Sequence, residues 1–117
     1  MLVFVGKLNY SPYAADELIT VVFRDNVQVG DKVAVILQWS QDASGQAKAN
    51  ASAHGTVGKL SAVSSPLNKK FELFSDEKES TYYWYKGELS GTKLNLAMWN
   101  KKGEEVAKNI ELQLIFA

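Results

Sequence analysis

Apolar and polar residues alternate one by one along several stretches of the chain. The alternation is strict over residues 92–98 and 109–116, and a third alternating run covers 33–37. A period of two is that of a β-strand with one face buried. Residues 18–23 form a short apolar run rich in β-branched side chains, which is typical of a buried strand. No long stretch has the three-to-four-residue spacing of an amphipathic helix, so the pattern predicts strands throughout.

Turn-forming residues separate these runs. Ser90-Gly91 lies between two alternating stretches, which is the spacing of a two-residue hairpin turn. Residues 100–103 fit a type I turn followed by Gly103 in the left-handed conformation. We therefore predict an all-β antiparallel fold of eight to nine strands, either a β-sandwich or a closed barrel.

Two segments leave their local structure open. Residues 11–17 contain a proline and two alanines and fit either a loop or a single helical turn. Residues 43–55 place alanines on alternate positions, which favours a strand. The high helix propensity of alanine also allows a short helix or a loop there.

Short matches between the two halves of the chain indicate an internal duplication. Residues 5–8 and 57–60 share the sequence Val-Gly-Lys-Leu, and residues 30–35 align with 91–96. The chain is then a single β domain, 1–117, built from two four-stranded halves, 1–56 and 57–117, neither of which can bury both faces alone. Chance similarity is the alternative explanation, because short glycine-lysine-apolar matches are common in β proteins.

The composition argues against some classes of binding partner and of location. The 117 residues carry 13 basic and 13 acidic side chains, and 46% are apolar, which is enough for the core of one domain. A net charge of zero argues against binding to nucleic acid, because such proteins carry a basic excess. The longest apolar runs are far shorter than a membrane span, so no integral membrane segment is predicted. The first residues do not resemble a secretory signal, so we expect a cytoplasmic location or leaderless secretion.

Few residues are candidates for catalysis or metal binding. The chain has no cysteine and a single histidine, His54, which excludes thiolate sites and leaves little room for a histidine relay. The acidic residues 76–79 lack the spacing of a calcium loop, and the dispersed glycines form no phosphate-binding motif. We therefore expect a protein that is not an enzyme and that holds no cofactor or metal.

The hairpin around Ser90-Gly91 divides its side chains between two faces. The predicted cross-strand partners are Tyr82 with Trp99, Trp84 with Ala97, Lys86 with Asn95 and Glu88 with Lys93. Because such partners share a face, one side of the hairpin collects apolar and aromatic side chains only. Together with the other alternating runs, this side predicts the core: Val33, Val35, Leu37, Tyr83, Tyr85, Leu94, Leu96, Met98, Ile110, Leu112 and Leu114.

The opposite face of the hairpin mixes large aromatic rings with polar groups. Tyr82, Trp84 and Trp99 supply the rings, and Asn95, Lys86 and Lys93 supply hydrogen-bonding groups. A flat ring can cover the C–H face of a sugar while amide and charged groups bond its hydroxyls. These six residues are therefore the candidate site for a saccharide ligand. The same rings can instead form an interface between proteins, or be covered by another part of the chain.

The outer positions of the corresponding hairpin in the first half are apolar. Val21, Phe23 and Ile36 would leave an apolar patch in water, so we expect a homo-oligomer, above all a dimer. The leading functional hypothesis is a non-catalytic, lectin-like carbohydrate-binding protein. The alternative is a self-assembling or protein-interaction domain, or a small toxin or effector, with the aromatic face as its interface.

Overall fold

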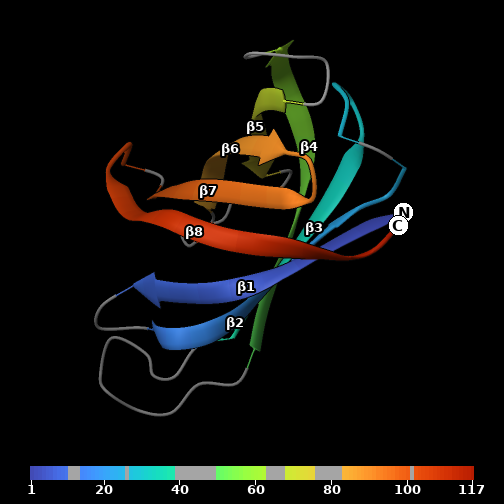
Figure 1. The fold of residues 1–117 in the computed structure, drawn as a ribbon. Helices are drawn as coiled ribbons and strands as arrows, with labels where there is room; N and C mark the ends of the chain where they lie inside the picture. The colour runs from blue at the N-terminus through green and yellow to red at the C-terminus, as the bar shows by residue number, and fades with distance from the viewer. Residues whose placement is uncertain (11–13, 26, 39–49, 63–67, 76–82, 101) are drawn as a thin grey trace.

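The chain folds into strands (Figure 1). The structure is a computed structural model that describes residues 1–10, 14–25, 27–38, 50–62, 68–75, 83–100 and 102–117. The strands are β1 (Leu2–Tyr10), β2 (Ala14–Phe23), β3 (Lys32–Gln38), β4 (Asn50–Ala62), β5 (Asn68–Ser75), β6 (Tyr83–Ser90), β7 (Lys93–Asn100) and β8 (Glu105–Phe116). None of the described segments is a helix that is long and apolar enough to cross a membrane. The prediction of an all-β protein is confirmed.

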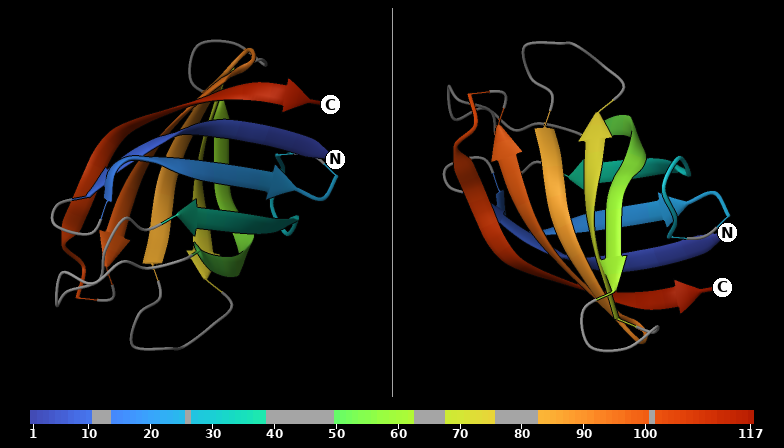
Figure 2. Two further views of the ribbon diagram at one scale, coloured as in Figure 1. Left: turned by 90° about the horizontal axis from the view of Figure 1, so that it is seen from below. Right: turned by 90° about the horizontal axis from the view of Figure 1, so that it is seen from above.

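The eight strands belong to one antiparallel sheet that curls around the core (Figure 2). Each strand pairs with the next one along the chain, and β8 pairs with β1, so that Val3 lies opposite Phe116. Gly6 permits this contact between the first and last strands. A Cβ atom at this position would collide with the backbone carbonyl of Glu111, so only glycine fits there.

The inner face of the sheet forms the hydrophobic core. Phe23 belongs to this core and makes edge-to-face ring contacts to Phe4 at 5.8 Å and to Phe71 at 5.9 Å between centroids. Of the predicted core residues, Tyr83 and Leu114 are partly buried against the core. The remaining nine predicted core residues are buried, which confirms the prediction: Val33, Val35, Leu37, Tyr85, Leu94, Leu96, Met98, Ile110 and Leu112.

The predicted outward direction of Val21 and Phe23 is wrong. Both side chains are fully buried, because Val21 pairs with Val35 and Phe23 pairs with Val33 on the core side of the sheet. Apart from Thr20, both alternate sets within residues 18–23 are apolar, so the sequence offered little contrast between the two faces of this strand. Of the three residues on which the expected dimer depended, only Ile36 lies outside, with 41% of its surface exposed.

The β6–β7 turn lies one residue later than the sequence indicated. Ser90 pairs with Lys93, so Gly91 and Thr92 are the turn residues. Gly91 has a φ of 62° at the first central position, where a type II′ turn requires glycine. This changes every cross-strand partner by two residues. Since side chains alternate with a period of two, each predicted side chain still lies on the predicted face.

The β7–β8 turn has the predicted glycine conformation. Gly103 has a φ of 82°, and its backbone N–H donates to the Asn100 carbonyl at 3.1 Å. The Asn100 side-chain oxygen accepts from the backbone N–H groups of Lys102 and Glu104, each at 3.0 Å. The asparagine side chain therefore holds the turn, as expected for this residue type.

The two segments left open by the sequence contain strand. Residues 14–17 belong to β2 rather than to a loop or a helical turn, and residues 50–55 belong to β4, as the alternating alanines favoured. The other parts of these segments, 11–13 and 43–49, lie outside the described residues.

The internal duplication stays a prediction. Residues 5–8 lie in β1 and residues 57–60 in β4, three strands apart, whereas 32–35 and 93–96 lie in β3 and β7, four strands apart. The boundary between 56 and 57 falls inside β4. The strand order therefore gives no separate support to two equivalent four-stranded halves.

Candidate functional site

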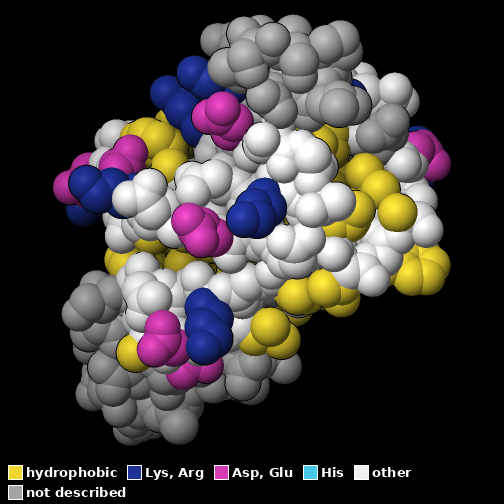
Figure 3. Space-filling model, in the orientation of Figure 1, with side chains coloured by type: hydrophobic (Ala, Val, Ile, Leu, Met, Phe, Trp, Pro, Cys, Tyr) yellow, Lys and Arg dark blue, Asp and Glu magenta, His cyan; other side chains and the backbone are white. Residues whose placement is uncertain are grey.

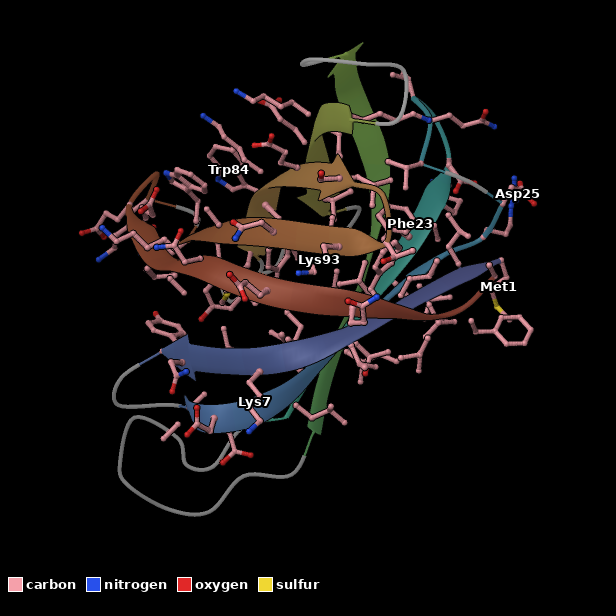
Figure 4. The ribbon with its side chains drawn as sticks, in the orientation of Figure 1. Met1, Lys7, Phe23, Asp25, Trp84 and Lys93 are labelled. Atoms are coloured by element: carbon pink, nitrogen blue, oxygen red, sulfur yellow. The ribbon has the colours of Figure 1, made fainter. Side chains whose placement is uncertain are left out.

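The outer face of β6 and β7 holds five of the six predicted site residues. Trp84 and Lys86 belong to β6, and Lys93, Asn95 and Trp99 belong to β7. They alternate with buried residues of the same strands, so all five share the outer face. Figure 4 shows Trp84 toward one end of the hairpin and Lys93 nearer the turn. Tyr82, the sixth predicted residue, lies outside the described residues.

The two tryptophans form a cross-strand pair. Trp84 lies directly opposite Trp99, not opposite Ala97 as predicted. Their rings stack with centroids 5.0 Å apart and planes inclined by 21°. The aromatic surface is therefore not a flat platform of adjacent rings. Each indole covers one face of the other, and both side chains are half-buried.

Lys86 joins the tryptophan pair to the polar part of the face. Its Nζ lies 5.0 Å from the Trp99 ring centroid and 5.6 Å from the Trp84 centroid. With 5.0 Å between the two centroids, the three points make a nearly equilateral triangle. The ammonium group therefore lies to the side of the stack, at a similar distance from both rings. Both distances are within the range of a cation–π contact.

A shallow depression lies next to Lys86 on the outer face. Its volume is about 390 Å³, and it extends over β5, β6 and β7. Gly87 and Phe71, which pair across β5 and β6, belong to its lining. Hydrogen-bond donors and acceptors alternate around it: Lys70, Glu72, Lys86, Glu88 and Asn95.

A second depression adjoins the first toward β8 and β1. It also has a volume of about 390 Å³, and Lys93 belongs to its lining. Glu88 and Asn95 line both depressions and lie directly opposite each other in the β6–β7 ladder. The remaining polar lining comes from Ser90, Glu111 and Gln113. Gln113 is held by a hydrogen bond from its Nε2 to the Thr92 hydroxyl at 3.0 Å.

Charges of both signs are interspersed on this surface. In the β5–β6 ladder Lys86 lies opposite Glu72, and Lys70 lies opposite Glu88. Figure 3 shows lysine and acidic side chains dispersed among uncharged groups on the side of the molecule that it presents. Such a surface does not select for an anion or a cation by its overall field. It can accept and donate hydrogen bonds at closely spaced positions.

Sequence reasoning missed the contributions of β5 and of Gln113 on β8. Lys70 and Glu72 alternate with the buried residues Phe71 and Leu73, so their outward direction was readable from the sequence. Their position beside Lys86 was not, because it depends on which strand pairs with β6. The predicted pairing of Glu88 with Lys93 is also wrong, since Asn95 is the partner of Glu88.

Among the described residues, no three histidine, cysteine or acidic side chains gather closely enough to hold a metal. The backbone of His54 pairs with Ala34 in the β3–β4 ladder, which is not part of this face.

The chain was compared with protein families, curated proteins and solved structures. No protein-family model, curated protein or solved structure matches the chain.

Proposed function

We infer that the chain is a non-catalytic saccharide-binding protein and that the ligand binds on the outer face of β5–β8. The observation that carries this proposal is the depression beside the tryptophan pair, where donors and acceptors alternate. A sugar hydroxyl both donates and accepts hydrogen bonds, so it needs both kinds of partner within a short distance. Asn95 supplies both kinds from one side chain, and Lys86 and Glu88 supply one each.

In this proposal the stacked tryptophans offer their two outer ring faces to the ligand instead of one flat platform. Each indole has one face that the other indole does not cover, and such a face can pack against the C–H groups of a sugar ring. Stacking also fixes the orientation of both rings before a ligand arrives. Less conformational entropy is then lost on binding, which favours affinity.

The surface favours binding over hydrolysis. Cleavage of a glycosidic bond requires a carboxylic acid that stays protonated near neutral pH, usually because it is buried. Glu88 and Glu111 are exposed on regular strands, and Glu72 is half-exposed. A water-accessible carboxylate is suited to accepting hydrogen bonds from hydroxyls.

We propose that the strands carrying the site belong to an eight-stranded closed barrel. The ladder that joins β8 to β1 supports this closure. Closure stiffens the strands that carry the site, and binding groups on strands are held more precisely than groups on loops.

A glycan array followed by titration of tryptophan fluorescence tests the proposal. We expect at least one glycan to bind and to change the fluorescence, and Trp84→Ala to abolish binding while a cooperative unfolding transition in denaturant is retained. Phe116→Ala is the matched control, because Phe116 is an aromatic residue with 56% exposure at the end of β8 and lines neither depression. An array without any bound glycan contradicts the proposal, as does a folded Trp84→Ala protein that binds normally.

A second candidate function is self-association through the outer face of β1–β3. Leu18 is 50% exposed and Ile36 is 41% exposed there, next to the half-buried Val5 and Val22. Apolar surface of this kind supports a dimer interface. Light scattering tests it: a dimer that becomes a monomer in Leu18→Glu or Ile36→Glu supports it. A monomeric parent at high micromolar concentration contradicts it.

A further inference from the structure

We propose that the ligand is an uncharged, extended oligosaccharide that lies across β5–β8 and fills both depressions at once. This inference rests on the proposed function and specifies its ligand. It starts from Glu88 and Asn95, which face each other across the β6–β7 ladder and line both depressions. Because the two depressions share these side chains, one chain-like ligand can pass from the first to the second without leaving the surface.

The width of the surface exceeds that of one sugar ring. Neighbouring strands are about 4.8 Å apart, so the four strands from β5 to β8 extend over roughly 14 Å. Lys70 on β5 lines only the first depression, and Gln113 on β8 lines only the second. A monosaccharide bound beside Lys86 occupies the first depression alone, whereas a chain of a few sugars reaches Gln113.

The charges that line the depressions favour a neutral ligand. They are three lysines, Lys70, Lys86 and Lys93, and three glutamates, Glu72, Glu88 and Glu111. A sulfated or uronic-acid chain would meet three carboxylates as well as three ammonium groups, and the like-charge contacts would offset the favourable ones. Hydroxyl groups can use ammonium groups as donors and carboxylates as acceptors, and such charge-assisted hydrogen bonds are the stronger kind.

The two tryptophans set the direction of the chain. Lys86 lines the first depression and lies within 5.0 Å of the Trp99 ring centroid, so the aromatic pair adjoins the first depression. The second depression contains no aromatic ring among its lining residues. One end of the oligosaccharide therefore packs against the indoles, and the remaining sugars are held by hydrogen bonds to the groups around Lys93.

A chain-length series tests the inference. Calorimetric titrations use neutral cello-, xylo-, malto- and N-acetylchito-oligosaccharides of one to six sugars. Within the series that binds, we expect affinity to rise with length and then to level off once both depressions are filled. If the monosaccharide binds as tightly as the hexasaccharide, the extended ligand is refuted while the saccharide-binding function stands. If neither these probes nor a glycan array shows any binding, both proposals are refuted.

Lys93→Ala tests the second depression directly, with Lys7→Ala as the matched control. Lys93 lines only the second depression, and Lys7 is an exposed strand lysine that lines neither. A hydrogen bond to a charged group is lost in Lys93→Ala, so we expect hexasaccharide binding to weaken roughly tenfold. Monosaccharide binding should stay unchanged, and Lys7→Ala should alter neither. Unchanged hexasaccharide binding by a folded Lys93→Ala protein would refute the inference.

Charged probes test the neutrality of the ligand. A heparin-derived hexasaccharide and an oligogalacturonate of six sugars should bind more weakly than the neutral hexasaccharide, and added salt should leave the neutral affinity unchanged. Tighter binding of either charged chain would overturn the assignment of an uncharged ligand.

Discussion

Trp84 and Trp99 lie directly opposite each other on β6 and β7, with their indole rings stacked at 5.0 Å between centroids. Two indoles at this distance, with their planes inclined by 21°, couple their electronic transitions. The pair should therefore give an exciton couplet in the far-ultraviolet circular dichroism spectrum. We expect Trp84→Phe and Trp99→Phe each to abolish the couplet. Replacement of either ring by alanine should lower the free energy of unfolding by about 0.5–1.5 kcal/mol beyond the loss of buried area.

The third tryptophan supplies the control for this spectrum. Trp39 lies outside the described residues. Trp39→Phe should leave the couplet in place. A couplet that survives Trp84→Phe but disappears in Trp39→Phe would mean that the stacked pair is not its source.

Leu96→Ala should be strongly destabilising. Leu96 has no exposed surface, and its removal leaves a cavity between strands that cannot easily collapse. We expect the free energy of unfolding to fall by about 2–5 kcal/mol in denaturant titration. Leu18→Ala is the matched control, because Leu18 is 50% exposed on a strand, and there the expected change is within about 0.5 kcal/mol. Equal losses in the two variants would show that the faces of the sheet are assigned wrongly.

Gly87→Ala tests a close contact beneath the first depression. A Cβ atom at Gly87 would lie 2.5 Å from Cζ of Phe71 and 2.8 Å from Cδ2 of Leu96, so the Phe71 ring would have to move. We expect a loss of about 1–3 kcal/mol in the free energy of unfolding. Phe71→Leu removes the ring that the new methyl group would meet.

A double-mutant cycle isolates this contact. The Gly87→Ala, Phe71→Leu protein should be more stable than the sum of the two single losses implies, by about 0.5–3 kcal/mol. Strict additivity would place the cause of the Gly87→Ala effect elsewhere in the sheet.

Tyr85 should make stability fall at alkaline pH. Burial raises the pKa of the Tyr85 phenol well above its usual range, and the neighbouring Tyr83 adds to the shift. The folded state therefore disfavours the phenolate, so the contribution of Tyr85 to stability is complete below the unfolded pKa of about 10 and is lost as the pH rises above it. The predicted slope from this group approaches about 1.4 kcal/mol per pH unit.

Tyr85→Phe is the comparison that separates Tyr85 from other groups that titrate at high pH. Denaturant titrations at a series of pH values should show the parent losing stability faster than Tyr85→Phe above pH ~10. Parallel curves for the two proteins would rule out the buried phenol as the cause.

Alternation along a strand was sufficient to assign its two faces where the odd-numbered and even-numbered residues differ in polarity. Leu94, Leu96 and Met98 alternate with polar or small residues, and all three are buried. The assignment survived an error in the position of the hairpin turn, because the error changed each partner by two residues and left the faces unchanged. In residues 18–23 of β2, where both sets are apolar apart from Thr20, Val21 and Phe23 were assigned to the wrong face.

The sequence by itself thus determined the strand class, the core side of β3, β6, β7 and β8, and the presence of Trp84, Trp99, Lys86, Lys93 and Asn95 on one outer face. All of these follow from local periodicity, which depends on backbone geometry alone. Only the tertiary structure decided that Trp84 stacks on Trp99, since cross-strand partners depend on which residue of the turn has a positive φ. Only the tertiary structure brought Lys70 and Glu72 beside Lys86, and Glu111 beside Asn95, because pairing between strands is a non-local contact that no single-strand pattern encodes.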